Sequence, residues 1–121
     1  MTIPTGSGTE VLKRATLGYA TTTDENSHAI FTSTNNHIYL IKSIIILHRY
    51  NVSDATVDIT VDPASGNDYY LLKGQGVPAS GSFVWNDVFV VQGGDTLKFE
   101  CASGGTTGFD VLCTYIDQDW S

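Results

Sequence analysis

The sequence has 121 residues and a formal net charge of −7, from 6 Lys+Arg and 13 Asp+Glu. A chain of this length is the size of one domain and buries about two-thirds of the surface that its unfolded form exposes, so it needs neither a disulfide nor a metal ion to be stable. The acidic balance repels phosphate backbones and provides no basic stripe, which argues against nucleic-acid binding.

Residues 1–8 carry neither the charged region nor the apolar region of a signal peptide, and we expect a flexible N-terminal arm there. The longest nearly apolar run, 38–47, is too short for a membrane span of about 20 residues. These features predict a protein without membrane contact that is made in the cytoplasm. We expect one folded domain over 9–117 and a short C-terminal tail over 118–121.

Period-two alternation marks the clearest predicted strands, because apolar and polar residues alternate through 56–62 and through 96–101. Such alternation is typical of half-buried strands. Less regular runs predict further strands at 10–21, 28–34, 37–51, 68–73, 81–91 and 108–117. About eight strands are therefore expected, and no segment has convincing helical spacing.

Turn-forming residues separate these runs at short intervals, at 24–27, 35–36, 51–54, 63–67, 74–78 and 92–95. Links this short join antiparallel neighbours, because parallel pairing needs a long crossover. The expected fold is all-β: a single antiparallel β-sandwich of jelly-roll or Greek-key type, with about eight strands.

Two predicted strands, in 38–47 and in 83–91, are apolar on both faces. In an antiparallel sandwich only one face of each sheet is dry. Two explanations remain open. Either the strands bend through bulges, with 42–43 and 86–87 as candidate sites, or their outer faces are covered by an oligomer contact or another partner.

The two cysteines, Cys101 and Cys113, lie on consecutive predicted strands. If these strands form a symmetric hairpin, Cys101 pairs near Asp110 and Cys113 near Lys98, about three positions or roughly 10 Å apart along the ladder. That separation is too long for a disulfide. We therefore expect buried free thiols, unless the strands pair in a different register.

No catalytic or metal-binding pattern stands out. His28, His37 and His48 lack the spacing that places two imidazoles on one face, and we expect a surface or edge position for each. The aspartates, such as Asp58 and Asp117, are expected mostly in turns or on outward strand faces, and no calcium-loop spacing occurs. The expectation is therefore no enzyme, no cofactor and no metal site.

Aromatic residues suggest an alternative function. Tyr69, Tyr70, Trp85 and Trp120 would form a carbohydrate-binding platform if they lined one concave face. Trp85 lies in an apolar strand and is expected in the core or in a subunit contact. Trp120, next to the end of the chain, is a candidate for docking onto a neighbour.

Two segments resemble the small β-sandwich virion proteins of tailed bacteriophages. In 39–61 a strand ends in an Asn-containing turn that leads into an alternating strand, and in 88–100 an apolar strand is followed by Gly-Asp-Thr-Leu at 94–97. The resemblance implies a structural virion protein, most specifically a capsid cement or decoration protein. A neck, collar or tail component is the alternative. It also implies self-association, as a trimer or another symmetric oligomer, and contact with the major capsid protein or other virion proteins.

On this interpretation the protein is part of the virion and is made in the cytoplasm of the bacterial host. Its contact surface combines the apolar strand faces with the two chain ends. The candidate partner-binding residues are Ile3, Pro4, Val84, Val88, Val90 and Trp120.

Overall fold

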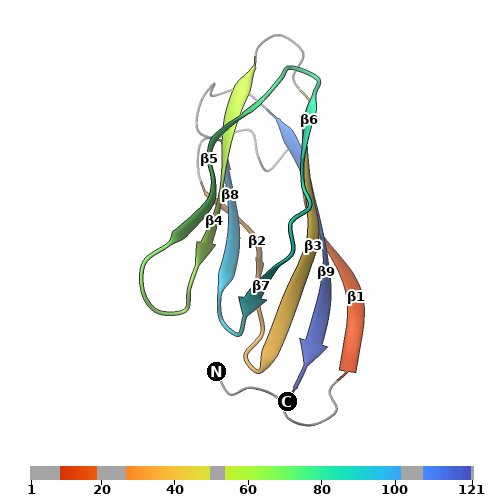
Figure 1. Cartoon of the computed structure of the whole chain (residues 1–121). Helices are drawn as coiled ribbons and strands as arrows, with labels where there is room; N and C mark the ends of the chain where they lie inside the picture. The colour runs from red at the N-terminus through yellow and green to blue at the C-terminus, as the bar shows by residue number, and fades with distance from the viewer. Residues whose placement is uncertain (1–8, 19–26, 50–53, 102–107, 121) are drawn as a thin grey trace.

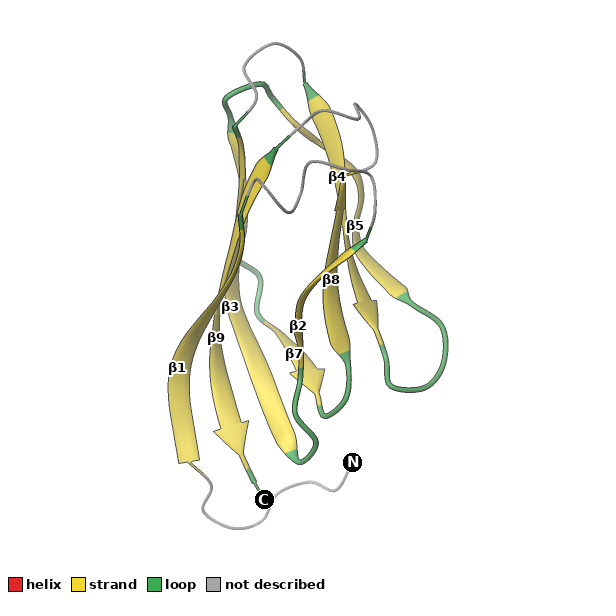
Figure 2. Ribbon diagram, turned by 180° about the vertical axis from the view of Figure 1, so that it is seen from behind, coloured by secondary structure: helices red, strands yellow, loops and turns green. Residues whose placement is uncertain are grey.

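The computed structural model describes residues 9–18, 27–49, 54–101 and 108–120, which form two facing antiparallel sheets (Figures 1 and 2). The predicted all-β sandwich is confirmed. The strands in these residues are β1 (Thr9–Leu17), β2 (His28–Thr32), β3 (His37–His48), β4 (Ala55–Asp62), β5 (Tyr69–Val77), β6 (Ser82–Trp85), β7 (Phe89–Gln92), β8 (Thr96–Cys101) and β9 (Phe109–Asp119). The described part of the chain contains no helix long and apolar enough to cross a membrane.

The strand order is that of a jelly roll. Sheet A has the order β1-β9-β3-β6, with β7 also paired to β3, and sheet B has the order β2-β8-β4-β5. The strands β6 and β7 pair with different parts of the same side of β3, at 44–47 and at 38–41. They therefore fill one strand position between them, and the sandwich has eight positions in two four-stranded layers.

The core lies between the sheets and follows the alternation of the strands. In β8 the inward residues are Leu97, Phe99 and Cys101, and all three are buried. The rings of Phe99, from sheet B, and Phe109, from sheet A, meet edge to face with centroids 5.4 Å apart. This contact of two fully buried rings joins the layers across the core.

A bulge in β3 lies at the first site expected from the sequence. Ile41 pairs with Tyr115 and Ser43 pairs with Thr114, so Lys42 is the extra residue. The extra residue shifts the alternation by one position, and both Ile41 and Ile44 are consequently buried. The second expected site, 86–87, lies in the break between β6 and β7.

The expected hairpin between the two cysteine-bearing strands is wrong. β8 lies in sheet B, where Cys101 pairs with Val57, and β9 lies in sheet A, where Cys113 pairs with Ile44. A link of a few residues is long enough either to close a hairpin or to span the roughly 10 Å between packed sheets. The length of the link therefore did not show which of these two connections it makes. The expected buried free thiols are confirmed. Burial raises the pKa of the Cys113 thiol to about 12.

Two strands run further than expected. β5 continues through the glycines of the predicted turn at 74–78, because a bulge absorbs Gly74 at a φ of 65°. The Gly74 N–H donates to Asp58 Oδ1 at 2.7 Å, and Asp58 is buried there. At the other end of the chain, β9 extends two residues past the expected boundary at 117.

One end of the sandwich is closed by hydrogen bonds between turns. The β2–β3 turn has Asn36 at a φ of 66°, a conformation that asparagine tolerates better than most residues. The Ser33 N–H donates to the Asp95 carbonyl at 2.8 Å and thereby joins this turn to the β7–β8 turn. The Trp120 N–H donates to the Asn36 carbonyl at 3.1 Å. The end of β9 is thus attached at the closed end.

Candidate functional site

The outer face of sheet A carries a row of apolar side chains across four strands. Cross-strand pairing places Leu12 of β1, Ile116 of β9, Leu40 of β3 and Val90 of β7 side by side. Leu12 is 70% exposed and Val90 is 52% exposed. We call these four residues the first apolar row.

A second apolar row lies further along the same face. It consists of Leu112, Ile45 and Val84, which are neighbours on β9, β3 and β6. Val84 is 51% exposed, and Leu47, two positions beyond Ile45, is also exposed. Large apolar side chains in such contiguous rows are unusual on the surface of a monomer and mark an interaction surface.

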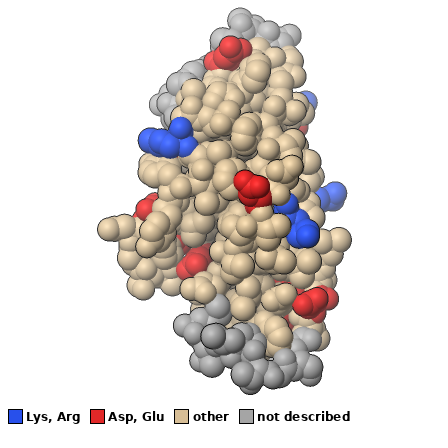
Figure 3. Space-filling view, in the orientation of Figure 1, with Lys and Arg blue, Asp and Glu red and all other residues tan. Residues whose placement is uncertain are grey.

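Basic residues lie between the two rows. Arg14 and the bulged Lys42 are exposed there, beside Thr114 and Ser43. Within the described residues neither forms an ion pair. The other four basic side chains each lie within 4 Å of an aspartate, in the pairs Lys13–Asp117, Arg49–Asp110, Lys73–Asp58 and Lys98–Asp62. Figure 3 shows how sparse charge is on one side of the sandwich, where isolated charged groups are separated by large uncharged areas.

Three of the predicted partner-binding residues lie at the β6/β7 edge of sheet A. Val84 and Val90 point outward from β6 and β7, and Val88, in the break between them, is 57% exposed. Trp120 lies apart from them at the closed end and is half-buried. Ile3 and Pro4 lie outside the described residues.

Sequence reasoning missed Leu12 as a surface residue. It is the most exposed large apolar side chain of the described chain. Its strand is apolar at Val11 as well, so alternation alone did not distinguish an inner face from an outer face. Pairing with β9 settles the question, because it puts Leu12 opposite Ile116 on the outer side.

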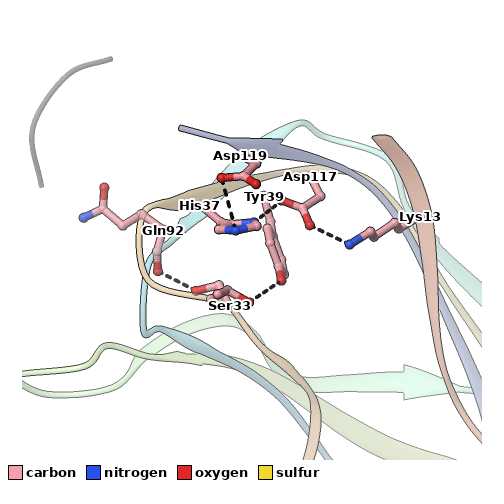
Figure 4. Close-up of polar contacts among 8 residues, drawn as sticks. Lys13, Ser33, His37, Tyr39, Gln92, Asp117 and Asp119 are labelled. Carbon is pink, nitrogen blue, oxygen red and sulfur yellow. Dashed lines mark hydrogen bonds and ion pairs between the residues drawn. The ribbon is translucent and has the colours of Figure 1, made fainter. Parts of the chain in front are cut away.

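A polar cluster around the buried Asp117 joins β1, β3 and β9 near the closed end (Figure 4). Asp117 accepts a hydrogen bond from Lys13 Nζ at 2.7 Å and another from His37 Nδ1 at 2.6 Å. The second ring nitrogen of His37 lies 3.4 Å from Asp119 Oδ1. The side chains of the cluster therefore link β1 and β9 to β3.

The environment of Asp117 differs from the outward or turn position expected for the aspartates. Its side chain is only 4% exposed, because position 117 alternates inward on β9. Burial raises the pKa of the Asp117 carboxyl, but hydrogen bonds and positive charge from Lys13 and His37 outweigh burial, so the net pKa lies below the ordinary 3.8.

His48 corrects the expectation of a surface or edge position for each histidine. It is fully buried, and its ring stacks on Phe109 with centroids 4.6 Å apart. The bulge at Lys42 is the reason, since it places Ile44, Ile46 and His48 on the inner side of β3. Among the described residues, no group of three or more His, Cys, Asp or Glu side chains is arranged to hold a metal ion.

The aromatic residues considered as a sugar platform do not share one face. Tyr69 and Tyr70 are consecutive in β5 and point to opposite sides of sheet B. Trp85 faces the core of sheet A, where its ring meets that of Phe89 edge to face. Trp120 lies at the closed end. This distribution gives no support to the carbohydrate-binding alternative.

Comparison with protein-family models finds no match, and comparison with curated proteins finds none either. Several solved structures share the fold. A chain from Bacillus endospore appendages, described as a novel family of disulfide-linked pili, aligns with a TM-score of 0.57 and 16% identity, over 100% of this chain and 97% of that one.

Two further structures align less closely. A chain from the acidic stable capsid structure of Helicobacter pylori bacteriophage KHP30 has a TM-score of 0.52 and 6% identity, over 93% of this chain and 89% of that one. The Drosophila NLP-core, described in relation to pentamer formation and histone binding, has a TM-score of 0.50 and 13% identity, over 93% and 100%. At these identities the likeness shows the fold alone. The fold is thus one found in pili and in a phage capsid.

Proposed function

We propose that the chain is a structural subunit of a symmetric protein assembly, and specifically a capsid cement or decoration protein of a tailed bacteriophage. The observation that carries the proposal is the outer face of sheet A, with its two apolar rows and its exposed valines at 84, 88 and 90. A surface of this kind is stabilised by being covered. The resemblance of 39–61 and 88–100 to virion proteins, and the shared fold with a phage capsid chain, support the virion setting.

In this role the protein works by contact and not by catalysis. It is made in the host cytoplasm and is incorporated into the virion, where it binds the major capsid protein or another virion protein and associates with further copies of itself. Buried area at junctions between subunits then resists pressure from inside the head. A position at the neck, collar or tail is the alternative within the virion.

A filament subunit is the second candidate, because the pilus chain aligns over nearly the whole of both chains. The sequence has 2 Cys, and Cys101 and Cys113 are both buried. A filament of this protein in its native fold would therefore not be held together by disulfides between copies. Its stability would depend on noncovalent contacts.

The test is to mix the purified protein with phage particles that lack it, sediment the mixture and image the particles by electron microscopy. Co-sedimentation with density at junctions between capsid subunits is the expected result. Density only at the tail vertex would move the protein to the neck or tail. Filaments formed by the protein alone would favour the second candidate, and no binding together with no filaments would contradict both.

A matched pair of variants connects the binding to the surface. Val84→Asp adds a carboxylate to the outer face of sheet A, whereas Ala29→Asp adds the same group to an exposed position on the outer face of sheet B. We expect Val84→Asp to reduce binding to particles at least about tenfold, because a charge must be desolvated in the contact. Ala29→Asp should bind like the unmodified protein. Equal binding by both variants would contradict the assignment of this face.

A further inference from the structure

The outer side of β1 has a charge pattern that reverses about Leu12. Glu10, Leu12 and Arg14 follow one another at two-residue spacing, so all three lie on the same face of the sheet, and all three are exposed. Along the first apolar row, Leu12 continues into Ile116, Leu40 and Val90. Glu10 and Arg14 thus lie at equal distances on either side of the first apolar row.

A pattern of this type is complementary to itself. Two copies can pack these sheets face to face, related by a twofold axis that runs along the first apolar row, midway between the sheets. This axis reverses the strand direction of the second copy, so each strand lies opposite the same strand of the other copy. Leu12 then meets Leu12 of the second copy. Glu10 of each copy lies over Arg14 of the other, which gives two equivalent ion pairs at the rim of the contact.

We propose that the outer face of sheet A binds the same face of a second copy about this twofold axis. The inference rests on the proposed function, because it names one of the contacts by which the subunit would assemble. A twofold dimer is one of the symmetric oligomers that the resemblance implies, and this contact can coexist with a trimer contact in one assembly.

Charge also disfavours the other simple twofold arrangement. An axis between the two apolar rows would pack the first row on the second, but it would pass along the basic residues and bring Arg14 onto Arg14 and Lys42 toward Lys42. Four cations that have no acidic partner among the described residues would then be desolvated together, which is strongly unfavourable. The axis through Leu12 avoids this clash of like charges.

The proposed axis also gives Trp120 and the second row a shared role. On β9 the axis passes through position 116, so Leu112 lies four residues to one side of it. Trp120 follows the end of β9 at Asp119, four residues to the other side, which places it near Leu112 of the second copy. The Trp120 N–H donates to the Asn36 carbonyl, so the Trp120 backbone is held at the edge of this contact.

The size of the face predicts a weak contact. Four strand positions, and the eight residue steps from position 112 to position 120 that the axis relates to each other, give a surface of about 20 Å by about 27 Å, or roughly 500 Å² per copy. A standard stable interface buries about 800 Å² per partner. We therefore expect dimers only at high protein concentration, and stable association only where many copies are arrayed together.

Sedimentation equilibrium of the whole chain over a wide concentration range tests the contact. The unmodified protein should dimerise reversibly. Arg14→Glu should weaken the dimer about tenfold or more, because each Glu10 then faces a carboxylate of the other copy where it had faced a guanidinium. The double variant Glu10→Arg with Arg14→Glu should restore it, because the exchanged charges again face each other across the axis.

A second variant distinguishes face packing from edge-to-edge pairing of β1 strands. Val90→Asp lies at the opposite end of the row from β1 and should weaken the dimer if the faces pack. Ala29→Asp on sheet B is the control and should leave the association unchanged. A protein that stays monomeric, a double variant that does not recover, or a Val90→Asp dimer of unchanged affinity would each overturn the inference. Particle binding by a monomeric protein would leave the proposed function standing.

Discussion

Lys13 and Asp117 are 104 positions apart in sequence, yet the Lys13 Nζ donates a hydrogen bond of 2.7 Å to the Asp117 Oδ2. The contact joins β1, an edge strand with no fully buried residue, to β9 in the interior of sheet A. An edge strand that buries so little apolar surface gains little from the hydrophobic effect. The ion pair and the backbone ladder therefore account for much of its attachment.

Replacing Asp117 should destabilise the protein. Asp117→Ala removes the shared acceptor of Lys13 and His37 and leaves both donors near a buried site, for which we expect a loss of about 2 kcal/mol in the free energy of unfolding. The measurement is urea denaturation followed by tryptophan fluorescence. The control is Asp110→Ala, which removes a more exposed and longer pair with Arg49 and should cost less than about 1 kcal/mol. Equal costs would contradict the special role of Asp117.

The stability of the protein should fall in acid through the same residue. The pKa of Asp117 is lower in the folded chain than its ordinary value of 3.8, so the stabilisation is fully present above the unfolded pKa and is lost as the pH falls through the folded pKa. Between about pH 5 and pH 2, the unmodified protein should therefore lose more stability than Asp117→Asn. Thermal unfolding at a series of pH values measures this difference, and parallel pH curves for the two proteins would be the contrary result.

Both thiols should be unreactive in the folded protein. Cys101 and Cys113 are buried, and a pKa of about 12 leaves only about one Cys113 thiol in ten thousand ionised at pH 8. A colourimetric thiol reagent should therefore detect both cysteines in denaturant and neither in native buffer. The melting temperature should be the same with and without a reductant. Rapid labelling of either residue in the native state would disagree with the packing described above.

Deleting Lys42 should be far less damaging than deleting Ile45 from the same strand. Without the extra residue, the Ile41–Tyr115 pair is followed directly by the Ser43–Thr114 pair, so the residues from Ile44 onward keep both their pairing with β9 and their inward or outward direction. Deleting Ile45 keeps the later part of β3 in place only if the bulge is lost and Ser43 takes the inward position of Ile44. We expect the Ile45 deletion to cost more than about 3 kcal/mol in the free energy of unfolding, because it removes a buried isoleucine from the core, and the Lys42 deletion to cost less than about 2 kcal/mol. Circular dichroism and urea midpoints compare the two variants, and equal costs would contradict the assigned bulge.

Much of the fold could be predicted from local patterns. Alternation in 56–62 and 96–101 gave β4 and β8 within one residue, because each of these strands has one face in the core. The bulge at Lys42 could be predicted because an uninterrupted alternation fails in a strand that is apolar on both faces. Both signals arise within a single strand.

The features that could not be predicted depend on contacts between strands. The packing of the whole sandwich decides whether β8 and β9 form a hairpin or cross between sheets. The sequence of the link between these strands does not indicate which of the two occurs. The same holds for Asp117, whose buried position depends on donors from Lys13 and His37 on two other strands. The outward direction of Leu12 likewise follows from its pairing with β9.

One margin of each sheet is poorly suited to accept an added strand. At the β6/β7 margin of sheet A, the break at 86–88 interrupts the row of backbone donors and acceptors, and at the β5 margin of sheet B the bulge at Gly74 does so. Such interruptions hinder uncontrolled growth of a sheet from chain to chain. The protein can therefore expose apolar faces at high local concentration with less risk that amyloid-like growth begins at these two margins.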